Sequence, residues 1–410
     1  MPEFLTLLPP LEARSILLNH FTHTCPLETV ESPRALGRVT ARPVQAPFAL
    51  PSFARSTVDG YAVRAVDTHG ANESLPAYLL DVGEVPMGTS PDLGITTAQC
   101  AVIHTGGMLP GGADSVVMIE HTQIAKIGEV EVLRAVGVGE NVLQPGEDVQ
   151  QSDEVIPAGR RLRPAEIGGL MALGIREVET VQSPRVAILS TGDEVIAAEE
   201  RLRPGQVYDV NTYTLSTLVQ QHGGLPIPFG IVADDEKSLR TEARRAMAEA
   251  DMVVITAGSS ASTRDLTAGV IDSLGEPGVL VHGVNVRPGK PTILGVCDGV
   301  PFIGLPGNPV SALVIAGLFV VPILEAMLGL EKKSTTPSVS ASLSVNLTSV
   351  AGREDWVPVQ LSQDQNGYRA EPVFGKSNLI FTLSRADGLV CIPPDANGLA
   401  VGDVVDVHLM

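Results

Sequence analysis

The chain has 410 residues, of which 44% are hydrophobic and 18% are charged, and its formal net charge is −19. These proportions indicate a globular protein of about two to four domains. Nucleic-acid phosphates bind to basic faces, so the acidic balance argues against nucleic acid as a partner. The four cysteines are scattered without a Cys-x-x-Cys motif, which argues against a disulfide framework and against a zinc site.

No segment is long and apolar enough to predict a membrane span. Residues 309–328 come closest, but their small residues and Pro322 favour a buried helix. The N-terminus lacks the basic region, apolar run and cleavage site of a signal peptide. We therefore expect a cytoplasmic protein that has no membrane partner.

The first elements in chain order predict a domain made from two segments. Residues 5–46 begin with an amphipathic helical pattern, and a second helix is expected to start near Pro164. Between them, residues 47–146 are rich in Gly, Thr and Val with short alternating runs, which is typical of β structure. We expect one elongated domain from residues 1–46 and 147–180, with a β-rich domain of residues 47–146 inserted into it.

Residues 181–331 alternate between apolar strands and amphipathic helices. Strands are expected at 186–190, 227–232 and 252–256, and a helix is expected to begin at Asn211. This alternation predicts an α/β domain with a mostly parallel, doubly wound sheet, whose ligands lie beyond the carboxyl ends of the strands. Further strands of the same sheet are expected at 279–286, 292–296 and 301–304.

The last part of the chain reads as a linker followed by a β domain. Residues 331–336 are polar and favour a linker. Residues 337–410 contain short β runs separated by Asn-Gly and Asp-Gly turns, which predicts a small C-terminal β barrel or sandwich.

Two loops about twenty residues apart indicate an anion site. The first is Arg287-Pro288-Gly289-Lys290-Pro291, and the second runs from Leu305 to Ser311 and opens into a long apolar helix. The N-terminus of a helix offers unpaired N–H groups and the positive end of its dipole. Together with Arg287 and Lys290, these loops predict a site for an oxyanion or a phosphate.

Polar residues also follow the predicted parallel strands. Ser190-Thr191-Gly192-Asp193-Glu194 comes after the first strand, and Asp234-Asp235 comes after the second. Such acids can bind Mg²⁺ or accept hydrogen bonds from a ligand, although one Asp of the second group is expected to cap a helix, as is Asp209 or Asn211 after the first. After the third strand, the Gly/Ser-rich loop that ends at Asp265 favours a phosphate cradle over a plain surface loop.

Other motifs are weaker when each is read alone. Asp59 lies in Ser-Thr-Val-Asp-Gly, where a simple Asx turn is favoured, and Thr105 lies in His-Thr-Gly-Gly, where a turn without ligand is equally plausible. Asp148 in Gly-Glu-Asp is more typical of solvated surface. Arg353 and Ser377 lie in ordinary hairpin sequences of the C-terminal domain.

The order of these motifs is more specific than any one of them. Ser-Thr-Val-Asp-Gly-Tyr-Ala, His-Thr-Gly-Gly, Gly-Glu-Asp, Ser-Thr-Gly-Asp-Glu, Tyr-Asp-Val-Asn, Pro-Gly-Lys-Pro and Leu-Pro-Gly-Asn-Pro-Val-Ser follow one another over nearly the whole chain. The chain thereby resembles the molybdopterin molybdenumtransferases, the MoeA family, which are related to the E domain of gephyrin. The resemblance implies four domains and a homodimer whose clefts combine parts of both subunits.

The resemblance also implies a reaction. Adenylyl-molybdopterin and molybdate are the expected partners, Mg²⁺ is the expected cofactor, and cleavage with release of AMP accompanies insertion of molybdenum at the dithiolene. By matching motifs, the implied catalytic residues are Asp59, Thr105, Asp148, Glu194, Asp234 and Asp265, and the metal ligands among them are Asp265, Asp234 and Glu194. The implied substrate- and molybdate-binding residues are Ser190, Thr191, Gly192, Arg287, Lys290, Pro306, Pro309, Ser311, Arg353 and Ser377.

The sequence departs from the family pattern in two places. Ser262 and Thr263 stand where the family usually has Gly and Glu, which removes one carboxylate, and Arg287 replaces a Lys. Two other readings stay open: a gephyrin-like scaffold that binds ligands or peptides without catalysis, and an adenylyltransferase that shares only the α/β domain. The retained acids argue against the scaffold, and the order of all four segments argues against the adenylyltransferase.

Overall fold

The computed structural model describes residues 7–21, 25–257, 261–330, 337–365 and 367–410, without the side chains of 261–265. The chain separates into two compact units. The first unit comprises residues 1–41, 158–163 and 179–410, and the second comprises residues 42–157 and 164–178.

A six-stranded sheet forms the centre of the first unit. Its strand order is β16-β13-β17-β21-β20-β18. The first four strands of this order run parallel to one another, whereas β20 runs antiparallel to both β21 and β18. The strands span Leu225–Val232 (β16), Arg185–Thr191 (β13), Met252–Ala257 (β17), Val300–Pro306 (β21), Ile293–Cys297 (β20) and Pro277–His282 (β18).

One predicted strand is wrong in its extent. The expected strand 279–286 is broken, because Gly283 has a φ of +101° and ends β18 at His282. The following pair, Val286–Arg287 (β19), joins a different sheet. The end of β18 still lies at the same edge of the sheet as the end of β21, since two antiparallel steps separate these strands.

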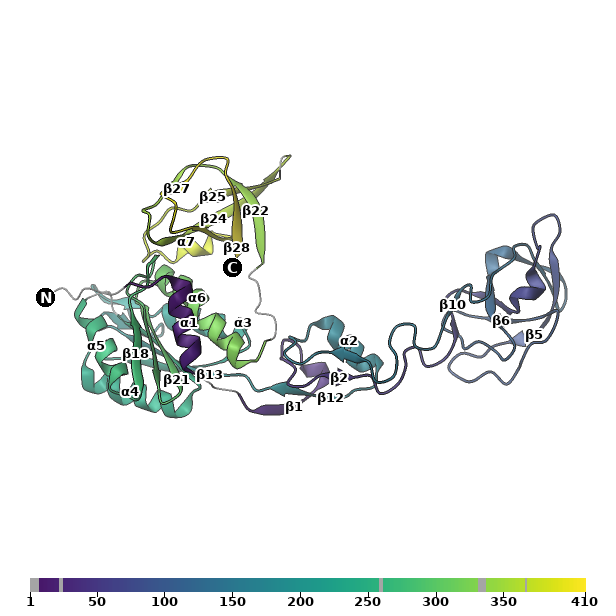
Figure 1. The fold of residues 1–410 in the computed structure, drawn as a ribbon, viewed down its shortest axis with the longest axis horizontal. Coiled ribbons are helices and arrows are strands. Elements are labelled where there is room, and N and C mark those ends of the chain that lie inside the picture. Colours follow the sequence, from purple (N-terminus) through teal and green to yellow (C-terminus); the bar gives the residue numbers. More distant parts are fainter. Residues whose placement is uncertain (1–6, 22–24, 258–260, 331–336, 366) are drawn as a thin grey trace. The chain divides into compact units, whose positions relative to one another are not determined.

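Helices cover both faces of this sheet (Figure 1). Helices α1, α3 and α6 contribute buried side chains to the core on one face, and α4 and α5 contribute to the core on the other. Helix α1 thus packs on the α/β domain, although the sequence pattern grouped its segment with residues 147–180. The helices span Pro10–His20 (α1), Asn211–Gln221 (α3), Glu236–Glu249 (α4), Ala261–Asp272 (α5) and Pro309–Met327 (α6).

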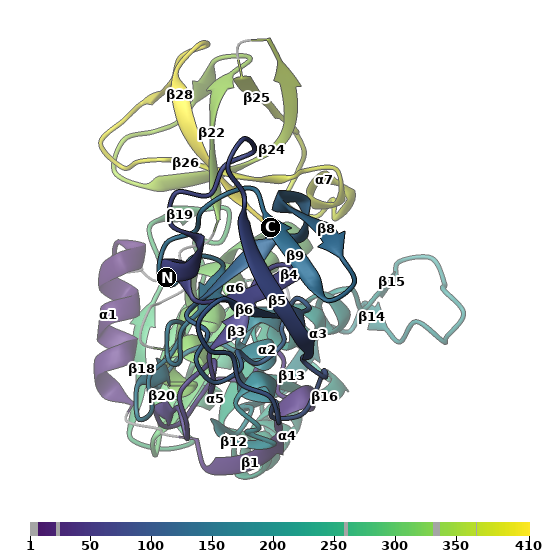
Figure 2. The same cartoon turned by 90° about the vertical axis from the view of Figure 1, so that its right-hand side faces the viewer.

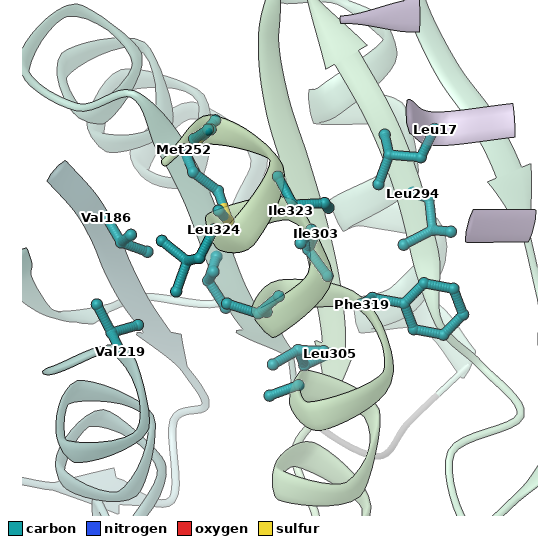
Figure 3. Close-up of a cluster of buried hydrophobic side chains, with 14 of the residues drawn as sticks. Leu17, Val186, Val219, Met252, Leu294, Ile303, Leu305, Phe319, Ile323 and Leu324 are labelled. Atoms are coloured by element: carbon teal, nitrogen blue, oxygen red, sulfur yellow. The ribbon is translucent and has the colours of Figure 1, made fainter. Parts of the chain in front are cut away.

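Helix α6 is the central element of the larger core (Figure 3). Its Phe319 is fully buried, and Ile323 and Leu324 pack in the same cluster as Leu294 and Ile303 of the sheet. Among the described residues, α6 is the one helix long and apolar enough to cross a membrane, but 67% of its apolar window is buried inside the protein. The prediction of a buried core helix is therefore confirmed.

The C-terminal strands of the first unit form a closed barrel (Figure 2). The order β24-β25-β22-β28-β26 closes because β26 also pairs with β24. Strand β19 of the α/β domain adds to β24 in parallel register, Val286 opposite Glu354 and Arg287 opposite Asp355. The elements span Ser338–Leu343 (β22), Leu347–Thr348 (β23), Glu354–Asp364 (β24), Gly367–Pro372 (β25), Phe381–Ser384 (α7), Gly388–Ile392 (β26), Gly398–Leu399 (β27) and Val404–Leu409 (β28).

Short strands complete the first unit. Strands β14 and β15 form a parallel pair that follows β13 (Figure 2), and β1 pairs with β12. They span Val195–Ile196 (β14), Val207–Tyr208 (β15), Leu27–Glu31 (β1) and Glu177–Val181 (β12).

The second unit is built on a six-stranded mixed sheet in the order β7-β4-β6-β5-β9-β8. Its apolar side chains form two cores, one around Val63 and Leu79 and the other around Ala62 and Ile103. Two small antiparallel pairs, β3 with β10 and β2 with β11, and helix α2 accompany the sheet. The elements span Val44–Gln45 (β2), Arg55–Ser56 (β3), Gly60–Val63 (β4), Ala77–Glu84 (β5), Gln99–Ile103 (β6), Ser115–Met118 (β7), Thr122–Lys126 (β8), Glu129–Val132 (β9), Val142–Leu143 (β10), Glu154–Ile156 (β11) and Pro164–Ala172 (α2).

Candidate functional site

Helix α7 of the barrel packs against the start of helix α6 (Figure 1). A pocket of about 1160 Å³ lies at this place in the first unit. Its walls come from the two loops that follow β18 and β21, from three stretches of the barrel and from Leu7. It collects six of the residues implied by the sequence: Arg287, Lys290, Pro306, Ser311, Arg353 and Ser377. Pro309 is the first residue of α6 and does not line the pocket.

The first loop is held tightly against α6. Gly289 has a φ of +112°, and a Cβ atom at this position would overlap the side chain of the buried Ile315. The hydroxyl of Thr292 donates to the carbonyl oxygen of Gly289 at 2.7 Å, and the N–H of Val284 donates to the carbonyl oxygen of Lys290 at 2.9 Å. Only glycine fits this close approach, so the loop presents Lys290 from a defined backbone.

The pocket is electropositive although the chain is acidic. Its walls carry Arg287, Lys290, Arg353 and Lys376, and one carboxylate, Asp355. That carboxylate is buried and accepts hydrogen bonds from Arg353, Nε to Oδ1 at 2.8 Å and Nη2 to Oδ2 at 3.2 Å, while Nη1 of Arg287 lies 3.7 Å from Oδ2. Within the described part of the chain, neither lysine has a carboxylate within 4.0 Å.

The second loop joins the α/β domain to the barrel. Asn308 precedes α6, and its Nδ2 donates to the hydroxyl oxygen of Ser377 at 3.1 Å. The N–H of Val310, in the first turn of α6, donates to the carbonyl oxygen of Ser377 at 3.0 Å. Asn211 donates to the carbonyl oxygen of Gly307 at 2.9 Å. The start of α6 is therefore fixed to both neighbouring walls, and Ser311 is buried beside it.

A second polar cluster lies at the carboxyl edge of the parallel strands. The buried hydroxyl of Ser190 contacts Oδ1 of Asp209 at 3.0 Å and the hydroxyls of Thr212 and Thr256 at 3.0 and 3.1 Å. Oδ1 of Asp209 also accepts from the N–H of Thr212, so Asp209 caps the start of α3. The structure thus places Ser190 in a closed hydrogen-bond network, not on the wall of the pocket.

Beside this network, several polar atoms lack partners. Oγ1 of Thr191, Oδ1 of Asn211 and Oδ1 of Asp234 are buried, and no hydrogen bond of standard geometry reaches them from the described residues. Burial raises the pKa of Asp234 above its ordinary value. The nearby Thr191 side chain opposes this shift, and the carboxylates of Asp193 and Glu194 add to it. Asp235 caps α4 by accepting from the N–H of Ser238, which confirms that one Asp of this pair is a cap.

Gly192 lies in the same turn. Its φ is +143°, and a Cβ atom there would come within 2.8 Å of Val195 Cγ2, so the turn that carries Glu194 requires glycine. Asp265 belongs to α5, but its side chain lies outside the described residues. In the part of the chain that the structure does describe, no three His, Cys, Asp or Glu side chains are arranged as a metal site.

The second unit has its own polar cluster. Oδ1 of Asp59 accepts from the N–H of Thr105 at 2.7 Å and from its hydroxyl at 3.1 Å, and these bonds lower the pKa of Asp59. His104 lies between two acids, with Nδ1 3.7 Å from Asp59 Oδ1 and Nε2 3.0 Å from Glu84 Oε1. Asp148 is exposed, and its N–H donates to the carbonyl oxygen of Leu50; among the described residues no hydrogen bond joins it to Asp59 or Thr105.

Several residues of the pocket were missed by sequence reasoning. Asp355, Trp356 and Lys376 line its walls. Lys376 lies in Gly375-Lys376-Ser377, which read alone is an ordinary hairpin feature. Asp355 and Trp356 carried no sequence signal, because their position in the pocket depends on the pairing of β19 with β24.

A doubly wound α/β domain joined to a closed β barrel, with a cationic pocket at their junction, defines a multidomain protein of the α/β plus β class. Family models match three stretches of the chain. The MoeA N-terminal region (domain I and II) matches residues 8–174, a probable molybdopterin binding domain matches 187–326, and the MoeA C-terminal region (domain IV) matches 340–410.

Similar proteins cover almost the whole chain. A putative molybdopterin biosynthesis protein of Methanocaldococcus jannaschii is 35% identical over 94% of this chain and 92% of its own length. A molybdopterin molybdenumtransferase of Nostoc sp. is 34% identical over 93% of this chain and 88% of its own length. The crystal structure of a molybdopterin biosynthesis moeA protein from Pyrococcus horikoshii OT3 superposes with a TM-score of 0.86 at 31% identity, covering 99% of this chain and 100% of that one.

This chain belongs to the MoeA family. It is a transferase of molybdenum cofactor biosynthesis that acts on a molybdopterin-related substrate. The predicted fold class, a multidomain α/β plus β protein with a C-terminal barrel, is confirmed.

Proposed function

We propose that this protein is a molybdenum insertase. It cleaves adenylyl-molybdopterin in a Mg²⁺-dependent reaction, releases AMP and inserts molybdate at the dithiolene. The observation that carries the proposal is the pocket, in which six residues implied by the family motifs meet although they come from four separate loops.

The pocket suits an oxyanion next to a larger ligand. Lys290, Arg287, Arg353 and the hydroxyls of Ser311 and Ser377 are the proposed molybdate contacts, since cations and hydroxyl donors bind oxyanions. Pro306 shapes the wall, and Pro309 starts α6. A volume of about 1160 Å³ exceeds the needs of a tetrahedral oxyanion and leaves room for a pterin phosphate.

The carboxyl edge of the sheet fits a divalent cation. Asp234 has a buried oxygen without a partner and a raised pKa, beside the carboxylates of Asp193 and Glu194. Mg²⁺ binds oxygen ligands of this kind, and a cation would relieve the repulsion among them. We propose that Asp234, Glu194 and Asp265 hold the metal, which when bound stabilises negative charge on the phosphates.

The remaining groups position the substrate. The turn Ser190-Thr191-Gly192 is the proposed contact for the pterin side of the ligand. The Thr191 hydroxyl, which lies beside Asp234, is its proposed hydrogen-bonding group, and Ser190 supports the turn from its closed network. Asp59, Thr105 and Asp148 are the proposed catalytic residues of the second unit. Thr105 holds one oxygen of the Asp59 carboxylate, which fixes the orientation of that side chain.

We further propose a cytoplasmic homodimer of four-domain subunits. The proposed domains are 1–46 with 147–180, 47–146, 181–331 and 337–410. The cysteines are free thiols, as expected of a reducing compartment. Light scattering coupled to gel filtration tests the assembly: a mass of one 43.0 kDa chain at micromolar concentration would contradict the dimer.

The reaction itself is tested by AMP release. The purified protein is incubated with adenylyl-molybdopterin, Mg²⁺ and molybdate, and AMP is measured by chromatography. We expect release that requires both the metal and molybdate and that is lost in Asp265→Ala. Release no greater than that of Asp265→Ala would reject the insertase and favour a non-catalytic scaffold.

Molybdate binding is tested separately through Trp356. This residue is the single tryptophan of the chain and lines the pocket. We expect molybdate to change its fluorescence in the wild type, and Lys290→Gln to weaken that response. If Lys290→Gln binds molybdate with unchanged affinity, the proposal that the oxyanion binds in this pocket is wrong.

A further inference from the structure

Lys376 lies on the barrel side of the pocket, in the loop that also carries Ser377. We propose that the ammonium of Lys376 binds the oxyanion together with Lys290, and that it makes the pocket prefer doubly charged over singly charged anions. This proposal rests on the proposed function of the pocket as an oxyanion site.

The charge balance of the pocket favours a leading role for the two lysines. Four cationic side chains and one carboxylate line it, so its formal charge is 4 − 1 = +3. Asp355 offsets one of these charges, and its two oxygens already engage both arginines, Arg353 by two hydrogen bonds and Arg287 at 3.7 Å. Lys290 and Lys376 thus supply two of the three net positive charges, and neither shares its charge with a described carboxylate.

The backbone on both sides of Lys376 is fixed before any ligand binds. The carbonyl oxygen of Ser377 accepts from the N–H of Val310 at 3.0 Å, and the carbonyl oxygen of Lys376 accepts from the N–H of Leu379 at 3.0 Å. Gly375 packs so closely on Thr382 that a Cβ atom would overlap the Thr382 side chain. Binding therefore orders only the Lys376 side chain, which keeps the entropic cost of the contact small.

The contribution of Lys376 to the free energy of binding depends on the charge of the anion. Coulomb energy is proportional to the product of the two charges, so loss of one cation weakens binding of a dianion twice as much in free energy as binding of a monoanion. Molybdate, tungstate and sulfate are tetrahedral dianions, whereas perchlorate is a tetrahedral monoanion. Comparing these ions separates charge from shape.

The experiment measures molybdate binding by equilibrium dialysis at fixed ionic strength, with molybdenum quantified by mass spectrometry and perchlorate measured as a competitor. Lys376→Gln keeps a long polar side chain without the charge, and Lys376→Arg keeps the charge. The matched control is Lys237→Gln in helix α4, which removes the same charge from the same unit but lies outside this pocket. Both positions are exposed on the surface, so folding is expected to be unaffected.

We expect Lys376→Gln to weaken molybdate binding about 10-fold, the order expected for one hydrogen bond to a charged group, and perchlorate binding about 3-fold. Lys376→Arg should remain near the wild type, and Lys237→Gln should not change. If Lys376→Gln binds molybdate with wild-type affinity, or if Lys237→Gln loses as much affinity as Lys376→Gln, the proposed role of Lys376 is overturned. Neither result would contradict the oxyanion site itself. A wild type that binds no molybdate would overturn both.

Discussion

Arg353 holds both carboxylate oxygens of Asp355, through Nε at 2.8 Å and Nη2 at 3.2 Å. The carboxylate is buried, and Arg287 approaches it from the α/β domain, where β19 pairs with β24. This single acid thereby connects the two walls of the pocket and orients both guanidinium groups. The geometry makes Asp355 a structural partner of the arginines.

Asp355→Asn should therefore lower the free energy of unfolding by about 1–3 kcal/mol, since it weakens charge-assisted hydrogen bonds at a buried site. Urea denaturation followed by Trp356 fluorescence measures the change. Asp395→Asn, at an exposed position of the same domain, is the control and should be neutral. Equal stability of the two variants would contradict the structural role.

Gly289→Ala tests the close packing of the first loop on α6. A Cβ atom would overlap Ile315, and the backbone has a φ of +112°, so we expect a stability loss of more than about 1 kcal/mol and weaker molybdate binding because Lys290 is displaced. Gly299→Ala is a matched control, with a φ of +88° but open space around the Cβ position. The control should lose stability without losing molybdate affinity; a shared loss of affinity would contradict the argument.

His222 predicts a pH dependence of stability. Burial lowers the pKa of His222 below its ordinary value, Arg161 lowers it further, and Glu325 opposes the shift. Below pH about 6.5, His222 is protonated in the unfolded chain but still neutral in the folded chain. The stability that neutral His222 contributes is therefore present at pH 8 and is lost as the pH falls towards the pKa of the folded state. His222→Gln should remove it, which makes the wild type lose more stability than the variant between pH 8 and pH 5.5. Thermal unfolding at both values checks this, and parallel curves would refute it.

The cysteines should react slowly with thiol reagents in the native protein. Burial raises the pKa of Cys25 to about 11 and the pKa values of Cys100, Cys297 and Cys391 to about 12. A thiol with a pKa of 12 is ionised in about one molecule in ten thousand at pH 8, and the thiolate is the reactive form. Titration with a disulfide reagent should release four equivalents only after unfolding. Rapid labelling of the native chain would show that burial does not protect these residues.

Parts of the α/β domain could be predicted because local pattern encodes them. The apolar runs became strands β13, β16 and β17, and the residues at their carboxyl ends came to one edge of the sheet. The prediction of one strand over 279–286 was wrong because an apolar run does not specify the strand with which it pairs. Gly283 turns the chain there, and Val286 pairs with a barrel strand about seventy residues later.

By itself, the sequence determined the family, through the order of motifs along the chain, and the alternation that makes a doubly wound sheet, since both are local properties. Only the tertiary structure decided which charges share the pocket. Asp355 meets Arg287 and Arg353 through the β19–β24 pairing, and Lys376 lines the same pocket as Lys290 because α6 begins against the Ser377 loop. Such relations depend on backbone hydrogen bonds between distant segments, which carry no signature in the side chains that they bring together.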